Sequence, residues 1–323
     1  MSLTRVFCLA MLLFAARAVI AAQPSAVVSL CPYCGRPVIG KVVPFAVMID
    51  DHRNARPQSG LNQACLVVEA PVEGGITRFM ALYGHGQTVP KIGPVRSMRP
   101  YFVSIARSLG AVLVHCGGSP AAYDLAPSLG LPRLDDIRGG YRAFWRDKNR
   151  SSPHNLFTSS ALVQAEIRRR GITLPSIDAA PFASSPVCAD LPASPLTITC
   201  ASCVFTAGSQ GYIRKINGID QRDEAGQAIM AVNVALFGVS CTVLDRTGRL
   251  GIALDELRAG LVYGPCSVQE AFWSSERAAR VLDGTGHPLP LSPGLFWLAL
   301  VPSAPKAAPA YDATPVRFEL WAD

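Results

Sequence analysis

Lysine is scarce in this chain of 323 residues, and several common signatures are missing from it. Of its 30 basic residues, 5 are lysines and 25 are arginines. No basic stripe interleaved with aromatic residues is present, so we expect no nucleic acid partner. No repeat of fixed period occurs. The chain also lacks a Ser-His or metal-catalytic motif, which favours a binding function over a catalytic one.

A short apolar run near the N-terminus predicts an export signal. The run Val6–Ala16 follows Arg5 and precedes small residues that offer a cleavage site after Ala22. Because the run is too short to span a bilayer, we expect a signal peptide over residues 1–22 and no transmembrane anchor after its removal. A lipid-attachment signal needs a small residue directly before the first mature cysteine, but a leucine precedes Cys31. We therefore expect an exported protein, periplasmic or extracellular, that is soluble rather than lipid-anchored.

Composition divides the mature chain into two regions. Residues 175–197 hold five prolines among alanines and serines, which is typical of a linker. Apolar runs alternate with helical patterns before it, and short strand-like runs separated by turns such as Asn217-Gly218 follow it. We therefore predict an α/β domain over residues 31–174, a mixed sheet with helices, followed by a smaller β-rich domain over residues 198–323.

Local signals place the elements of the first region. Pro100 suits the first position of a helix that stops at Gly110, and Ser119 suits the N-cap of a second helix. A third helix is expected from Ser160 to Gly171, where arginines in the last turn complement the helix dipole. Compact β-branched and aromatic runs predict strands at residues 45–50, 64–70, 77–83 and 111–115.

Arginines are concentrated in the first region, where eleven of them lie between Arg53 and Arg150. A guanidinium is a fixed cation with a planar fork of donors, which suits a phosphate, a carboxylate or an acidic sugar. A GC-rich genome alone also explains an excess of arginine, so positions beside glycine-rich turns matter more than the number. The candidate ligand-binding residues are Arg56, Arg78, Arg96, Arg99, Gly117, Gly118, Ser119, Arg146 and His154.

The glycine turn after the fourth predicted strand supplies part of this candidate site. Gly117, Gly118 and Ser119 lead into a helix start, an arrangement in which free backbone N–H groups can cradle an anion. An ordinary connection between a strand and a helix is the alternative interpretation.

Carboxylates at strand ends complete the candidate site. Asp50 ends one predicted strand, and Glu73 opens the turn before Arg78. In the functional interpretation, arginines hold an anionic substrate while Asp50, Glu73 or His154 transfers a proton. In the alternative interpretation the same groups form a structural ion-pair network, because buried arginines require carboxylate partners.

Two pairs of cysteines have the C-x-x-C spacing. Cys31 and Cys34 lie in a C-P-x-C-G turn, the form of a zinc knuckle. With Cys200 and Cys203 they would supply four thiolates for a structural zinc ion, provided that the fold brings the two pairs together. Disulfides are the alternative in an oxidising compartment, and a thiol-redox motif is a third interpretation.

The order of several motifs resembles that of the YerB-like family of bacterial lipoproteins. The stretches are VMIDDHRNARPQSGLNQA, VEGGITRFMALY, KIGPVRSMRPYF, HCGGSPAAY and FWRDKNRSSPHNLF, then GYIRKINGIDQRDEAG and SPGLFWLALVP, over most of residues 37–302. The resemblance implies an exported protein with an α/β first domain and a β-rich second domain. This chain departs from the family in lacking the lipid-attachment signal and in carrying Cys34 where the family has threonine. At the level of strand order, the chain also resembles the LytR-CpsA-Psr glycan transferases, whose arginines and acids hold a polyprenyl pyrophosphate.

Together these features predict an exported protein of the cell envelope that binds an anionic ligand through an arginine-lined cleft. The expected partner is a phosphorylated or acidic glycan, lipid-linked forms included, or another phosphorylated envelope component. One alternative is an envelope enzyme that transfers or hydrolyses such a glycan. Another is a structural or interaction protein with a zinc or disulfide staple.

Overall fold

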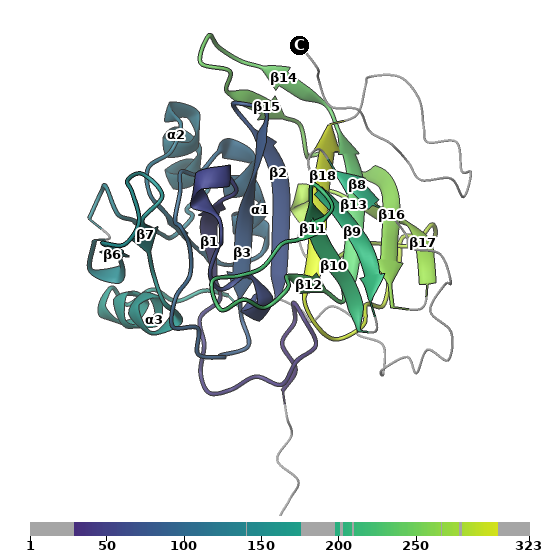
Figure 1. Cartoon of the computed structure of the whole chain (residues 1–323), viewed down its shortest axis with the longest axis horizontal. Helices are drawn as coiled ribbons and strands as arrows, with labels where there is room; N and C mark the ends of the chain where they lie inside the picture. The colour runs from purple at the N-terminus through teal and green to yellow at the C-terminus, as the bar shows by residue number, and fades with distance from the viewer. Residues whose placement is uncertain are drawn as a thin grey trace, which may run out of the picture.

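The computed structural model describes residues 29–139, 141–175, 198–200, 203–208, 210–265, 267–277 and 280–302. The expected signal peptide, the expected linker from residue 176 on and the chain after residue 302 lie outside these described residues. Figure 1 shows the described elements gathered around one large sheet.

The large sheet has nine strands and is formed by both regions of the chain. Their order is β17-β16-β13-β18-β2-β3-β1-β4-β5. Strand β18 lies parallel to both β13 and β2, so strands of the second region extend the sheet that the first region begins (Figure 1). The strands are β1 (Phe45–Asp50), β2 (Leu66–Val72), β3 (Ile76–Tyr83), β4 (Val112–His115), β5 (Arg133–Asp135), β13 (Asn233–Val239), β16 (Arg258–Gly264), β17 (Ser267–Trp273) and β18 (Phe296–Pro302).

Smaller sheets and helices surround this sheet. A five-stranded sheet contains β8 (Ile198–Cys200), β9 (Cys203–Gly208), β10 (Gly211–Ile216), β11 (Ile219–Asp220) and β12 (Met230–Ala231). Two-stranded sheets pair β6 (Trp145–Arg146) with β7 (Leu156–Phe157), and β14 (Cys241–Val243) with β15 (Leu250–Ile252). The α-helices are α1 (Pro100–Ser108), α2 (Pro120–Ser128) and α3 (Ser160–Arg169), and 3-10 helices span Arg53–Ala55, Leu61–Gln63, Tyr141–Ala143 and Ser275–Arg277. This architecture confirms the predicted class, a mixed α/β fold with a β-rich second region.

Two hydrophobic cores lie on opposite faces of the large sheet. Side chains along a strand alternate between its faces, and Met48 and Val47 of β1 accordingly belong to different cores. The core with Met48 also contains Phe102 and other residues of α1 and α2. The core with Val47 contains Phe205 of the five-stranded sheet and residues of α3. Each face of the sheet is therefore covered by different elements.

The α-helices begin and end near the positions that the sequence predicts. Pro100 is the first residue of α1, and the side chains of Ser119 and Ser159 cap α2 and α3. Gly110 and Gly171 follow the ends of α1 and α3 with φ angles of 55° and 62°, a left-handed conformation that favours glycine. Local capping signals were thus sufficient to place these helices.

Candidate ligand-binding site

Two adjacent carboxylates at the end of β1 contact different groups. Asp50 is the last residue of the strand and pairs across the sheet with Arg78 of β3. Asp51 follows the strand and contacts Thr77 and Arg214 instead. Because neighbouring side chains of a strand point to opposite faces, the residues that the sequence placed in one site divide into two groups.

Asp50 gathers three of the predicted cationic or basic residues. Its Oδ2 atom lies 2.9 Å from Nε of Arg96 and 2.7 Å from Nδ1 of His154. Burial acts to raise the pKa of Asp50, but the charges of Arg96 and Arg78 and the hydrogen bond with His154 outweigh it, so this pKa lies below its ordinary value. Arg96 forms an ion pair with this carboxylate, and Arg78, which donates to the carbonyl of Ser97, acts on it through its charge. The imidazole of His52 stacks on that of His154, with ring centroids 4.9 Å apart.

Asp51 and Glu69 belong to a buried network built around Arg214, a residue that the sequence did not single out. Nη2 of Arg214 lies 2.7 Å from Oε1 of Glu69 and 3.3 Å from Oδ2 of Asp51. The hydroxyl of Thr77 lies 2.9 Å from Asp51 and 2.8 Å from Glu69, so its single proton is shared between the two carboxylates, and Nε1 of Trp297 donates to Glu69. All five side chains are buried. Burial acts to lower the pKa of Arg214, but the two carboxylates raise it above its ordinary value. This group is a structural ion-pair network, formed by residues other than the predicted site residues.

A polar pocket of about 660 Å³ contains two of the predicted ligand-binding residues, Arg56 and His154, together with Arg150. Nε of Arg56 lies 3.1 Å from Oδ1 of Asp51, so its charge is partly balanced. Arg150 donates to the carbonyl oxygens of Ala55 and Pro57 at 2.7 and 2.9 Å. These acceptors are neutral, and no ion pair of Arg150 occurs among the described residues, but its charge acts on the nearby carboxylates of Asp147 and Glu224 and lowers their pKa. The other lining residues are Asn54, Pro57, Asp147, Asn149, Ser151, Ser152, Pro153 and Glu224.

The wall of this pocket is formed by both regions of the chain. Glu224 comes from the second region and accepts a hydrogen bond from Ser59 of the first at 2.7 Å. Nζ of Lys91 lies 2.7 Å from Asp147 and 2.8 Å from Glu224, which balances part of the charge of these two acids. Within the pocket, Arg150 is therefore the guanidinium most available to an added anion.

The remaining predicted residues lie outside the pocket lining. Arg99 forms a two-pronged ion pair with Glu73, and burial lowers the pKa of Arg99. Arg146 lies 3.3 Å from Asp136 and is half exposed. Arg96 forms an ion pair with Asp50, and Asp50 in turn contacts His154 in the pocket lining, while Arg78 acts on Asp50 through its charge. Glu73 is therefore an ion-pair partner rather than a neighbour of His154.

The expected anion cradle is already satisfied by the chain itself. The N–H group of Gly117 donates to Oδ1 of Asp135 at 3.0 Å, and that of Ser119 donates to the carbonyl of Met98. Gly118 approaches Met98 so closely that a Cβ atom there would lie 2.8 Å from its side chain. These contacts favour the alternative interpretation, an ordinary connection between β4 and α2.

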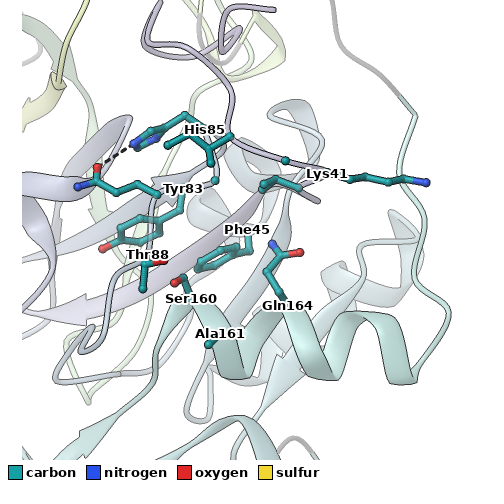
Figure 2. Close-up of a pocket in the computed structure, with 13 residues that line it drawn as sticks. Lys41, Phe45, Tyr83, His85, Thr88, Ser160, Ala161 and Gln164 are labelled. Carbon is teal, nitrogen blue, oxygen red and sulfur yellow. Dashed lines mark hydrogen bonds between the residues drawn. The ribbon is translucent and has the colours of Figure 1, made fainter.

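A second, smaller cavity of about 230 Å³ lies where β1 and β3 approach α3 (Figure 2). Phe45, Tyr83, Ser160 and Gln164 line it, and Figure 2 shows the side chain of Lys41 extending away from the ring of Phe45. With Lys41 as the one permanently charged side chain in its lining, this cavity offers less to an anion than the larger pocket does.

The structure does not bring the two C-x-x-C pairs together. Cys31 and Cys34 are buried in the core beneath α1 and α2. Cys203 is buried in the opposite core and is disulfide-bonded. The predicted set of four thiolates, Cys31, Cys34, Cys200 and Cys203, is therefore corrected, because the sheet separates Cys203 from Cys31 and Cys34 and Cys203 is in a disulfide. Cys65 is buried in the same core and lies beside Cys31 and Cys34.

Comparison with known proteins identifies the family. Residues 35–173 match the domain family described as "Protein of unknown function (DUF3048) N-terminal domain". The chain is 30% identical over 276 residues to "Putative lipoprotein YerB" of Bacillus subtilis (strain 168), covering 82% of this chain and 83% of that protein. The crystal structure of YerB from Bacillus subtilis superposes with a TM-score of 0.73 at 27% identity, covering 85% of this chain and 97% of that one. The chain belongs to the YerB-like family, which confirms the resemblance seen in its motifs.

The name of this relative corrects one expectation. The relative is named a lipoprotein, which contradicts the prediction of a protein that is soluble rather than lipid-anchored. That prediction rested only on the residues before one cysteine, Cys31, and such local context is too narrow to exclude an anchor. Among the described residues, no helix combines the length and the apolar character needed to cross a membrane.

Proposed function

We propose that this protein binds an anionic ligand of the cell envelope, a phosphorylated or acidic glycan, in the pocket lined by Arg56, Arg150 and His154. The observation that carries the proposal is the guanidinium of Arg150, which lines the pocket but donates only to neutral carbonyl oxygens. A phosphate or carboxylate placed there would form a charge-assisted hydrogen bond. The charges of Arg78 and Arg96, which both act on the carboxylate of Asp50, add to the positive potential beside the pocket.

The dimensions and the polar lining of the pocket support a glycan. Its volume of about 660 Å³ falls within the roughly 300–1,000 Å³ of small-molecule sites. Asn54, Asn149, Ser151 and Ser152 line it with groups that hydrogen-bond to sugar hydroxyls. The relative is named a lipoprotein, which supports a location at a membrane, where lipid-linked glycans with a phosphate are within reach.

A second candidate function is catalysis by His154. Nδ1 of His154 lies 2.7 Å from the carboxylate of Asp50, so a proton on Nδ1 is held there and Nε2 carries the lone pair. A carboxylate that fixes the imidazole in this tautomer is the arrangement of a general base. In this alternative the protein is an envelope enzyme that hydrolyses or transfers the bound glycan.

Calorimetric titration with glucose 1-phosphate, glucuronate and uncharged glucose tests the binding proposal. We expect the two anions to bind and glucose to bind more weakly. Arg150→Gln should weaken binding of glucose 1-phosphate by about tenfold or more, because a hydrogen bond to a charged group contributes about 1.5–3 kcal/mol. If neither anion binds to the unaltered protein, the proposal is contradicted.

Arg146→Gln is the matched control, because Arg146 comes from the same loop but lies outside the pocket lining. Its affinity should stay within twofold of the unaltered protein, and an equal loss in both variants would show that only general charge matters. Release of inorganic phosphate distinguishes the enzyme alternative. Turnover that falls about 100-fold or more in His154→Gln would support catalysis, and binding without turnover would leave the protein a binder.

A further inference from the structure

Three buried cysteines lie together at one end of the large sheet, and a histidine lies beside one of them. The Sγ atoms of Cys31, Cys34 and Cys65 all lie within 4.8 Å of one another, and those of Cys31 and Cys65 are 3.7 Å apart. Nδ1 of His85 lies 3.1 Å from Sγ of Cys65. All four side chains are buried, and none of them lines the larger pocket.

The hydrogen bonds of His85 orient its ring toward the sulfurs. Nε2 of His85 lies 2.9 Å from Oε1 of Gln87. An amide oxygen only accepts hydrogen bonds, so the ring proton is on Nε2 and the lone pair of Nδ1 faces Cys65. Histidines that bind metals characteristically donate their other N–H group to such an acceptor.

The backbone around the cysteines has the form of a metal knuckle. Cys34 precedes Gly35, which has a φ of 64°, and the N–H group of Gly35 donates to the carbonyl of Cys31 at 2.9 Å. The N–H group of Gly84 donates to Sγ of Cys65 at 3.3 Å. A Cβ atom at Gly84 would lie 2.6 Å from the ring of Tyr33, so glycine is required for the knuckle to pack on this loop.

We propose that Cys31, Cys34, Cys65 and His85 form a structural zinc site. Zinc in structural sites is bound by four thiolate or imidazole ligands in a tetrahedron, with Zn–S distances of about 2.3 Å. Two sulfurs of such a tetrahedron are about 3.8 Å apart by simple geometry. The 3.7 Å between Cys31 and Cys65 matches this spacing. Nδ1 of His85 lies beside Cys65 but outside the group formed by the three sulfurs, so its ring must move toward Cys31 and Cys34 to reach the ion.

The placement of the four ligands indicates what the ion would do. Cys31 and Cys34 lie in the segment before β1, Cys65 directly precedes β2, and His85 follows β3. The N–H groups of Gly294 and Phe296, beside and in β18, donate to the carbonyls of Cys34 and Cys65. The ion would therefore fasten the N-terminal segment to the point where strands of both regions meet. Four protein ligands leave no open position, so the role is structural rather than catalytic.

A disulfide is the competing state of the same residues. Three neighbouring thiols permit one disulfide and leave a third thiol buried beside it, whereas a zinc ion engages all three and the imidazole as well. Export to an oxidising compartment favours disulfides kinetically, so the oxidation state of these cysteines decides between the two.

Metal analysis of the mature, full-length protein purified without a histidine tag tests the proposal. We expect one zinc per chain, and thiols of Cys31, Cys34 and Cys65 that react with an alkylating reagent only after zinc is chelated. Cobalt substituted for zinc should show the visible bands of a tetrahedral ion and thiolate-to-metal charge transfer. Cys241→Ser, which removes a free thiol in β14, is the matched control and should change neither result.

Ligand variants separate the zinc site from general effects on folding. Cys65→Ser should abolish stoichiometric binding. If that variant fails to fold, Gln87→Ala is the milder change and should lower zinc affinity by roughly 10–100-fold, because it removes only the acceptor that orients His85. No zinc in the purified protein, together with no cobalt spectrum after reduction, would overturn the proposal. A disulfide between any two of the three cysteines in the purified protein, or an acyl chain on Cys31, would overturn it as well.

Discussion

At the residue scale, a few buried charges decide what the arginines can do. The sequence predicted that arginines lie near the carboxylates at strand ends, and in the structure Asp50 at the end of β1 contacts Arg96 and His154. Which arginines lack a hydrogen-bonded acid could not be predicted, because this depends on residues distant in the chain. Arg150 is the clearest example, since its partners are the carbonyls of Ala55 and Pro57.

Arg214 provides the residue-scale prediction on stability. Arg214→Ala leaves the buried carboxylates of Asp51 and Glu69 without their common partner. We expect a loss of about 3–5 kcal/mol in the free energy of unfolding, as for other broken buried ion pairs. Urea denaturation measures it. Arg222→Ala is the control, since Arg222 is 58% exposed and its removal should cost at most about 0.5 kcal/mol. A similar small loss for Arg214→Ala would refute the network.

At the element scale, local sequence signals predict where strands and helices lie, but they do not predict which strands pair over long distances in the chain. Strand β1 and the starts of α1 and α2 lie where the sequence predicts them, because prolines, caps and apolar runs act over a few residues. Strand β2 extends two residues further than expected because Pro71 and Val72 still pair with β3. The parallel pairing of β18 with β2 joins residues as distant as Leu66 and Phe296, and no local pattern announces such a partner.

Helix α3 provides a pH-dependent prediction. The hydrogen bond from Arg169, then that from Arg170, lowers the pKa of Glu166 from 4.5 to about 2 although burial opposes the shift. A carboxylate whose pKa is lower in the folded state stabilises the fold fully above pH 4.5, and this contribution is lost as the pH falls from 4.5 through about 2. In urea unfolding, Glu166→Gln should therefore be less stable than the unaltered protein at pH 6, with a difference that shrinks by pH 2.5.

A second glutamine variant controls for the general effect of acid. Glu276 is exposed in a 3-10 helix, so Glu276→Gln should follow the unaltered protein at both pH values. A stability difference for Glu166→Gln that stays constant between pH 6 and pH 2.5 would show that the ion pairs with Arg169 and Arg170 contribute nothing.

At the scale of the whole molecule, the two regions share one sheet and one pocket. Strand β18 lies between β13 and β2 in the sheet. Arg214 and Trp297 of the second region both contact Glu69 of the first. We therefore predict a single cooperative unfolding transition, in which tryptophan fluorescence and far-ultraviolet circular dichroism change together on heating. Two separated transitions would mean that each region folds independently.

The proposed binding of an anionic ligand depends most directly on the pocket that contains Arg56, Arg150 and His154. A crystal structure of the protein with glucose 1-phosphate would test it in one measurement. We predict that the phosphate lies in this pocket within hydrogen-bonding distance of Arg150. A phosphate bound elsewhere, or a pocket that stays empty at saturating ligand, would contradict the account.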